Sequence, residues 1–170
     1  MKIKNAIKSL REEGIAVYEN ESPEHWGKFK DIIDSSTTDF FQKNINNNAD
    51  PAELNHVRLK SYRDLNALEN WDNAYYLMAS NLLSAVFGPD LLIQRKLNLS
   101  IQMPNDESSL LGMHADTLSG QSPFEFVMWT AFTKAYDTNS MFYFDRETSK
   151  EIFYEMVQNE SEGLEALREK

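Results

Sequence analysis

The spacing of hydrophobic residues predicts helices in the first half of the chain. Over residues 2–13, apolar side chains recur at intervals of three and four residues, which is the spacing of one helical face. Ser22 followed by Pro23 is typical of a helix start, because serine caps a helix and proline suits its first turn. Thr38 and Asp39 indicate the cap of another short helix.

The segment from residue 52 to residue 87 is also predicted to be helical. Its clearest part runs from Trp71 to Phe87, where apolar residues keep the helical period. Gly88 and Pro89 would end this helix, since glycine is common just after a helix and proline cannot continue one.

After Pro89 the hydrophobic period changes from near four to two. In residues 96–103, alternate positions are apolar (Leu97, Leu99, Ile101, Met103) and polar (Lys96, Asn98, Ser100, Gln102). This alternation predicts a strand with one apolar face and one polar face. The polar face would meet water on an open sheet, or line a polar cavity in a barrel or a double sheet.

Further strands are predicted over residues 110–116, 124–132 and 141–144, and a helix over residues 147–157. The order of helices, then strands, then a helix predicts an α+β fold in one structural domain. In that fold, residues 1–90 form a helical N-terminal layer, and residues 91–170 carry the strands and the C-terminal helix.

The composition narrows the class of protein. The chain has 170 residues and a formal net charge of −10, and 41% of its residues are hydrophobic, which is enough for a core. The acidic balance argues against nucleic acid and anionic membranes as partners, because both are bound by clustered lysine and arginine. No apolar run is long enough for a membrane span, and lysines interrupt the N-terminal segment where a signal peptide would be apolar. With no cysteine, we expect a cytoplasmic protein without disulfides.

Candidate chemistry is concentrated at His114 and Asp116. On a strand, residues two apart project to the same face, so an imidazole and a carboxylate would meet there. These are two of the three ligands of the facial triad in non-haem Fe(II) oxygenases. The spacing alone is a weak signal, because such a pair is also found as a simple hydrogen-bonded pair. The other histidines, His25 and His56, are interpreted as surface or packing residues on helices.

The sequence around this pair resembles a known enzyme family. The runs that carry the resemblance are residues 96–106, 109–117 (with Met113-His114-Ala115-Asp116-Thr117), 120–129 (with Ser122-Pro123-Phe124-Glu125) and 138–141. They resemble the 2-oxoglutarate/Fe(II)-dependent oxygenases, and within them the sporadic carbohydrate cluster type. The resemblance covers about residues 55–155.

The resemblance implies a double-stranded β-helix (jelly-roll) core, incomplete in this chain, behind a helical N-terminal layer. It implies that His114 and Asp116 hold Fe(II), and that 2-oxoglutarate is the cosubstrate in the oxidation of a small, carbohydrate-related molecule. Because related halogenases replace the carboxylate by a small residue, Asp116 favours a hydroxylase or a desaturase. Asn98 and Gln102 are the candidates for lining the cosubstrate pocket, and ordinary solvent-facing strand positions are the alternative for both.

One part of the family pattern is missing. The family has a second histidine well downstream and a basic residue about ten positions after it, but none of the 54 residues that follow Asp116 in this 170-residue chain is a histidine. Arg146 and Arg168 are the late arginines, and neither follows a histidine. The resemblance then implies that the chain is a truncated or split product, or that it has lost the last ligand. Missing closing strands would expose sheet edges and favour a homo-oligomer.

Two other functions stay open from the sequence. A non-catalytic jelly-roll relic would keep a ligand cavity without turnover. A cupin-like epimerase or isomerase is a weaker alternative, because cupin metal sites draw on more histidines than this chain has.

Overall fold

The computed structural model describes residues 2–44, 49–104, 106, 112 and 114–158. The chain divides into two compact units, Met1–Leu110 and Leu111–Lys170, called here the first and the second unit.

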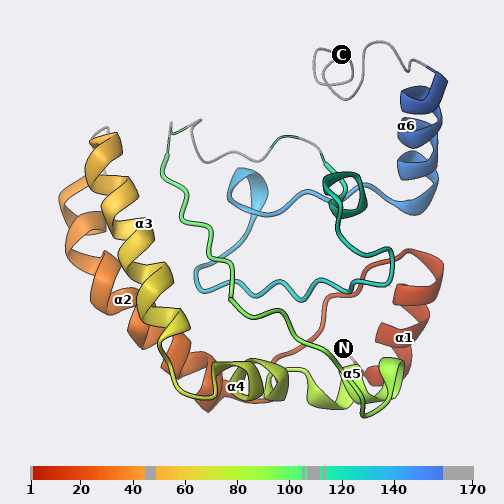
Figure 1. The fold of residues 1–170 in the computed structure, drawn as a ribbon, viewed down its shortest axis with the longest axis horizontal. Helices are drawn as coiled ribbons and strands as arrows, with labels where there is room; N and C mark the ends of the chain where they lie inside the picture. The colour runs from red at the N-terminus through yellow and green to blue at the C-terminus, as the bar shows by residue number, and fades with distance from the viewer. Residues whose placement is uncertain (1, 45–48, 105, 107–111, 113, 159–170) are drawn as a thin grey trace. The chain divides into compact units, whose positions relative to one another are not determined.

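The first unit is built from helices. They are α1 (Ile3–Glu12), α2 (Pro23–Asn44), α3 (Pro51–Asn66), α4 (Trp71–Leu77) and α5 (Ser80–Phe87). Helices α2 and α3 lie side by side as a hairpin, α4 packs on α2 and on α5, and α5 packs on α1 (Figure 1). The helix predicted over residues 2–13 is confirmed as α1, with Ala6 fully buried in its apolar face.

Helix α2 begins at Pro23, as the Ser22-Pro23 pair predicts. The prediction of a separate short helix that Thr38 and Asp39 would cap is wrong, because α2 continues without a break to Asn44. The Thr37 hydroxyl donates to the Ile33 carbonyl at 2.8 Å, so this polar side chain is satisfied inside the helix.

The helical prediction for residues 52–87 is divided by the structure into three helices. Asp50 caps α3 by accepting a hydrogen bond from the Ala52 N–H at 3.2 Å, and Pro51 occupies the first turn. Asn70 has a φ of 55°, in the left-handed region that asparagine tolerates well, and this residue separates α3 from α4. The segment from Trp71 to Phe87, predicted as a single helix, forms two helices, α4 and α5.

Helix α5 is capped from a distant part of the chain. Its own N-cap residue, Ala79, has no side chain that could accept a hydrogen bond. The Glu21 carboxylate instead accepts from the Asn81 N–H at 2.9 Å and from the Ser80 hydroxyl at 3.2 Å. A carboxylate at a helix N-terminus is favourable because it meets free N–H groups and the positive end of the helix dipole.

The core of the first unit lies between the α2–α3 hairpin and an extended segment. Phe40, Leu54, Val57 and Ile101 form one buried cluster, and Leu99 and Met103 pack against it. Residues 97–103 therefore alternate between apolar side chains that face the hairpin and the exposed polar side chains of Asn98, Ser100 and Gln102. The two faces expected from the sequence are present, although the described residues form no sheet.

The predicted jelly-roll core is wrong. The described residues contain helices and no strand, and the extended segment at residues 97–103 lies beside α3 (Figure 1). Asn66 and Arg58 of α3 hydrogen bond to its backbone in the place of a neighbouring strand. A period of two indicates that one side of an extended segment is covered, but it does not say whether a strand or a helix covers it.

In its described residues, the second unit contains the short 3-10 helices η2 (Asp116–Ser119) and η3 (Asp137–Asn139), followed by helix α6 (Arg146–Gln158). The helix predicted over 147–157 is confirmed as α6. The strands predicted over 124–132 and 141–144 are irregular backbone, and part of the strand predicted over 110–116 lies outside the described residues. No described side chain of this unit is buried.

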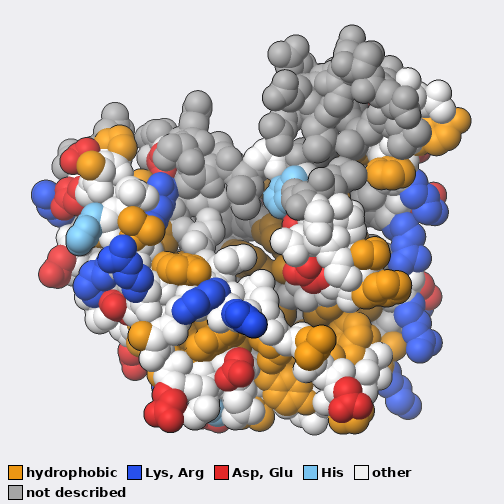
Figure 2. Space-filling model, in the orientation of Figure 1, with side chains coloured by type: hydrophobic (Ala, Val, Ile, Leu, Met, Phe, Trp, Pro, Cys, Tyr) orange, Lys and Arg blue, Asp and Glu red, His pale blue; other side chains and the backbone are white. Residues whose placement is uncertain are grey.

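The outer surface of the α2–α3 hairpin carries basic and acidic side chains together (Figure 2). Ion pairs such as Lys60–Asp64 at 2.6 Å, one helical turn apart, contribute to this mixed surface. In the part of the chain that the structure describes, no helix combines the length and the apolar character needed to cross a membrane.

Candidate functional site

His114 and Asp116 come together at the start of η2. The backbone of Ala115 between them is extended, with a φ of −124° and a ψ of 136°. An extended residue turns its two neighbours to the same side, and the His114 Nε2 and the Asp116 Oδ1 are 3.6 Å apart. The two side chains converge because Ala115 alone is extended, so their convergence does not require a strand.

A backbone carbonyl orients the His114 ring. The His114 Nδ1 lies 2.8 Å from the carbonyl oxygen of Gly112. Because a carbonyl can only accept a hydrogen bond, Nδ1 carries the proton, and Nε2 of the neutral ring presents its lone pair. The same arrangement, in which the second ring nitrogen donates to a carbonyl, orients histidine ligands in metal sites.

The His114 Nε2 and the Asp116 carboxylate are not a hydrogen-bonded pair. Their 3.6 Å separation is too long for a hydrogen bond, and in the neutral ring both atoms are acceptors. Two facing acceptors are stabilised by a positive charge, either a proton on Nε2 or a cation that both atoms bind. Bonds of 2.0–2.2 Å from a divalent ion to nitrogen and oxygen span this separation readily.

The pair is open to solvent. The side chain of His114 is 43% exposed and that of Asp116 is 47% exposed. A cation bound here would therefore keep positions for water or for a small chelating molecule.

Among the described residues, no third ligand accompanies this pair. Within the described residues, no three His, Asp or Glu side chains are grouped closely enough to hold a metal ion. His25 lies in the first unit at the start of α2, where its Nδ1 forms a hydrogen bond of 2.5 Å with the Ser22 hydroxyl. His56 is exposed on α3. Both positions agree with the interpretation of these two residues as surface or packing histidines.

The other candidate residues lie elsewhere. Asn98 and Gln102 are exposed on the extended segment of the first unit, in the solvent-facing arrangement that was the alternative to a cosubstrate pocket. Arg146 is the exposed first residue of α6, and Arg168 lies outside the described residues. The Gly112 carbonyl is the partner that sequence reasoning missed, because a backbone acceptor leaves no mark in the side-chain pattern.

Comparisons with protein-family models, with curated proteins and with solved structures found no match for this chain. The resemblance to the 2-oxoglutarate/Fe(II) oxygenases therefore stays a prediction from the sequence.

Proposed function

We propose that the chain binds a divalent metal ion at His114 and Asp116, and that with Fe(II) and 2-oxoglutarate it oxidises a small molecule of carbohydrate type. The observation that carries the proposal is the orientation of the pair. The hydrogen bond from His114 Nδ1 to the Gly112 carbonyl leaves Nε2 facing the Asp116 carboxylate at 3.6 Å.

The two side chains fit such an ion chemically. Imidazole and carboxylate together suit Fe(II), Mn(II) and Zn(II), whereas Ca²⁺ prefers oxygen ligands alone. The Asp116 charge offsets part of the charge of the ion, and the Gly112 carbonyl makes the His114 nitrogen more basic. With iron and 2-oxoglutarate bound, the metal would supply the oxidising chemistry, and the role of the two residues is to hold and orient it.

A second function is favoured by a different observation. The described residues bring no third protein ligand to the pair, and catalytic metal sites usually have three. Metal binding without turnover is therefore the alternative, and it differs from the first proposal in its response to 2-oxoglutarate.

The test starts with metal binding by the full chain without oxygen. Mn(II), an electron paramagnetic resonance probe for the Fe(II) position, is titrated into the wild type and into His114→Ala and Asp116→Ala. We expect each variant to bind at least about tenfold more weakly, because one of two protein ligands is gone. His56→Ala, which removes an exposed imidazole from α3, is the matched control and should bind as the wild type does. Equal binding by the wild type and both ligand variants would overturn the proposed site.

The second step separates the two functions. Fe(II) and 2-oxoglutarate are added to the metal-binding protein, and succinate is measured after oxygen is admitted. Succinate release that is lost in His114→Ala and retained in His56→Ala supports the oxygenase. Metal binding without 2-oxoglutarate binding or succinate release contradicts the oxygenase and supports the alternative.

A further inference from the structure

The extended segment at residues 97–103 has two backbone edges that differ in their partners. In an extended chain, the N–H and C=O of one residue point to the same edge, and those of the next residue point to the opposite edge. Leu97, Leu99 and Ile101 therefore direct their backbone groups to one edge, and Asn98, Ser100 and Gln102 direct theirs to the other.

The first edge is bound by α3 at Leu97 and Ile101. The Leu97 N–H donates to the Asn66 Oδ1 at 2.7 Å, and the Leu97 carbonyl accepts from the Asn66 Nδ2 at 3.0 Å. The Ile101 carbonyl accepts from the Arg58 Nε at 2.9 Å. Two side chains of one helix thus take the positions that a neighbouring strand would occupy.

The second edge is open. Within the described part of the chain, the backbone groups of Asn98, Ser100 and Gln102 have no hydrogen-bond partner, and all three residues are exposed. An edge with free N–H and C=O groups on a regular extended segment is a template for another strand.

We propose that this edge pairs with the same edge of a second copy of the chain, antiparallel and with Ser100 opposite Ser100. In this register Asn98 of each copy lies opposite Gln102 of the other, and the three pairs exchange both of their hydrogen bonds. The side chains of Asn98, Ser100 and Gln102 then form one polar face across both copies. The apolar side chains of each copy stay on its own α2–α3 hairpin, so no buried contact is lost.

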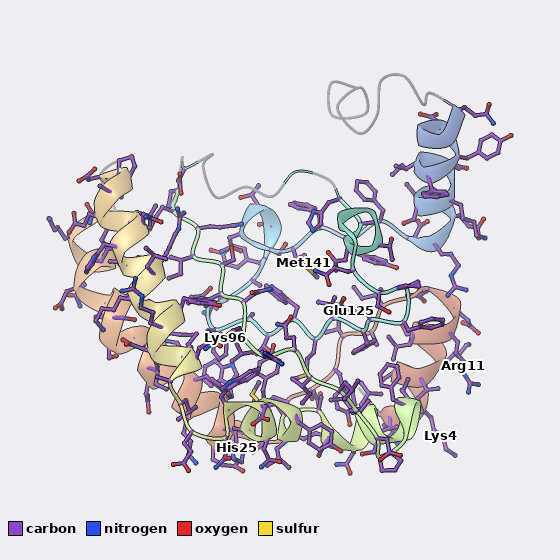
Figure 3. All side chains as sticks on the ribbon, viewed as in Figure 1. Lys4, Arg11, His25, Lys96, Glu125 and Met141 are labelled. Carbon is purple, nitrogen blue, oxygen red and sulfur yellow. The ribbon has the colours of Figure 1, made fainter. Side chains whose placement is uncertain are left out.

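The ends of the segment favour this arrangement. Pro104 has no N–H, so it ends the ladder and disfavours registers that shift the pairing toward it. Arg95 and Lys96 directly precede the segment, and both are exposed. Figure 3 labels Lys96. Antiparallel pairing keeps these basic residues of the two copies at opposite ends, whereas parallel pairing would place like charges side by side.

The chain lacks cysteine, so a single introduced thiol tests the register. At Ser100→Cys, the two Cα atoms would be about 5.5 Å apart in a hydrogen-bonded pair, within disulfide range. Mild oxidation should convert most of this variant to a covalent dimer. Ser35→Cys, an exposed position on α2, is the matched control and should stay monomeric. Equal crosslinking of the two variants would overturn the proposal.

The second measurement is the molar mass by light scattering over a range of concentrations. We expect the mass to rise from 19.7 kDa toward twice that value. Ser100→Pro removes the central N–H and should weaken the dimer at least about tenfold, whereas Ser100→Ala keeps the N–H and should dimerise as the wild type does. A monomer at every concentration, or a dimer that Ser100→Pro leaves intact while far-ultraviolet circular dichroism shows the helices unchanged, contradicts the proposal.

Discussion

The side-chain amide of Asn66 binds both backbone groups of Leu97, at 2.7 Å to the N–H and 3.0 Å to the carbonyl. Asn66 is the last residue of α3, and its amide also donates to the Tyr62 carbonyl at 2.8 Å. One side chain therefore holds the end of a helix and the start of the extended segment together. This connection covers one edge of that segment without a sheet.

We expect Asn66→Ala to lower the free energy of unfolding by about 1–3 kcal/mol, because it leaves the partly buried Leu97 N–H and carbonyl without partners. Urea denaturation followed by circular dichroism measures the change. Asn73→Ala, at an exposed position of α4, is the control and should change the stability by less than about 0.5 kcal/mol. Equal losses in the two variants would show that the Asn66 contacts contribute nothing specific.

Arg58 joins α3 to the end of the same segment. Its Nε donates to the Ile101 carbonyl at 2.9 Å, and its guanidinium lies 2.6 Å from the Asp106 carboxylate. The two side chains are only 23% and 18% exposed. We expect Arg58→Ala to cost about 1–3 kcal/mol of stability, and Arg58→Lys to recover part of this, since lysine keeps the charge but lacks the fork of donors.

A double-mutant cycle with Asp106→Asn isolates the Arg58–Asp106 contact. A coupling free energy of about 0.5 kcal/mol or more is expected for two side chains in contact. Additive effects of the two changes would contradict a stabilising pair.

Tyr18 should titrate at unusually high pH. Its hydroxyl donates to the Glu21 Oε1 at 2.6 Å. This hydrogen bond, with burial and the repulsion from Glu21 and Glu19 added, raises the pKa of Tyr18 to about 12. A pKa raised on folding means that the contribution to stability is complete below the usual tyrosine pKa of about 10 and is lost as the pH rises through 12. Absorbance titration should show a late-titrating tyrosine, and Glu21→Gln should lower the pKa of Tyr18.

Glu21 should make stability sensitive to acid. Burial raises the pKa of Glu21, but hydrogen bonds from Tyr18, Asn81 and Ser80 outweigh it and hold the pKa below its usual range. A pKa lowered on folding gives stability that is present above the usual glutamate pKa and is lost as the pH falls through the folded value. Urea midpoints measured from pH 6 downward should therefore fall more in the wild type than in Glu21→Gln. Parallel curves for the two proteins would contradict this role.

Phe29 tests the contact between α2 and α4. Its side chain is fully buried, and its ring meets the Tyr75 ring edge-on with centroids 5.7 Å apart. We expect Phe29→Ala to cost about 3–5 kcal/mol, from lost apolar burial and the cavity left behind. Phe29→Leu keeps most of the volume and should cost clearly less. Thermal or urea unfolding measures both, and equal losses would contradict a cavity effect.

The helices were largely predictable from the sequence, because their signals are local. The Ser22-Pro23 start and the apolar face of α1 depend on neighbouring residues alone. The end of α4 was not predictable, because the carboxylate that caps α5 comes from Glu21, about sixty residues earlier in the chain. Thr38 was misread as a cap, since threonine caps helices but is also accommodated within them.

The prediction of a sheet was wrong for a different reason. Alternation in residues 97–103 correctly indicates which side chains are covered, but the covering element is chosen by distant residues such as Asn66 and Arg58. The prediction of the candidate site depended only on local backbone geometry. His114 and Asp116 face the same side when the single residue between them is extended. Their convergence therefore does not depend on the fold that was expected around them.

The exposure of the second unit has a calorimetric consequence. A unit with no buried side chain among its described residues adds little to the heat absorbed in a cooperative transition, because this heat accompanies the loss of close packing. At about 0.7 kcal/mol per residue near 60 °C, melting of the first unit alone would absorb about 80 kcal/mol, against about 120 kcal/mol for the whole chain. A scanning calorimeter can thus show how many residues melt together, and the smaller heat is expected.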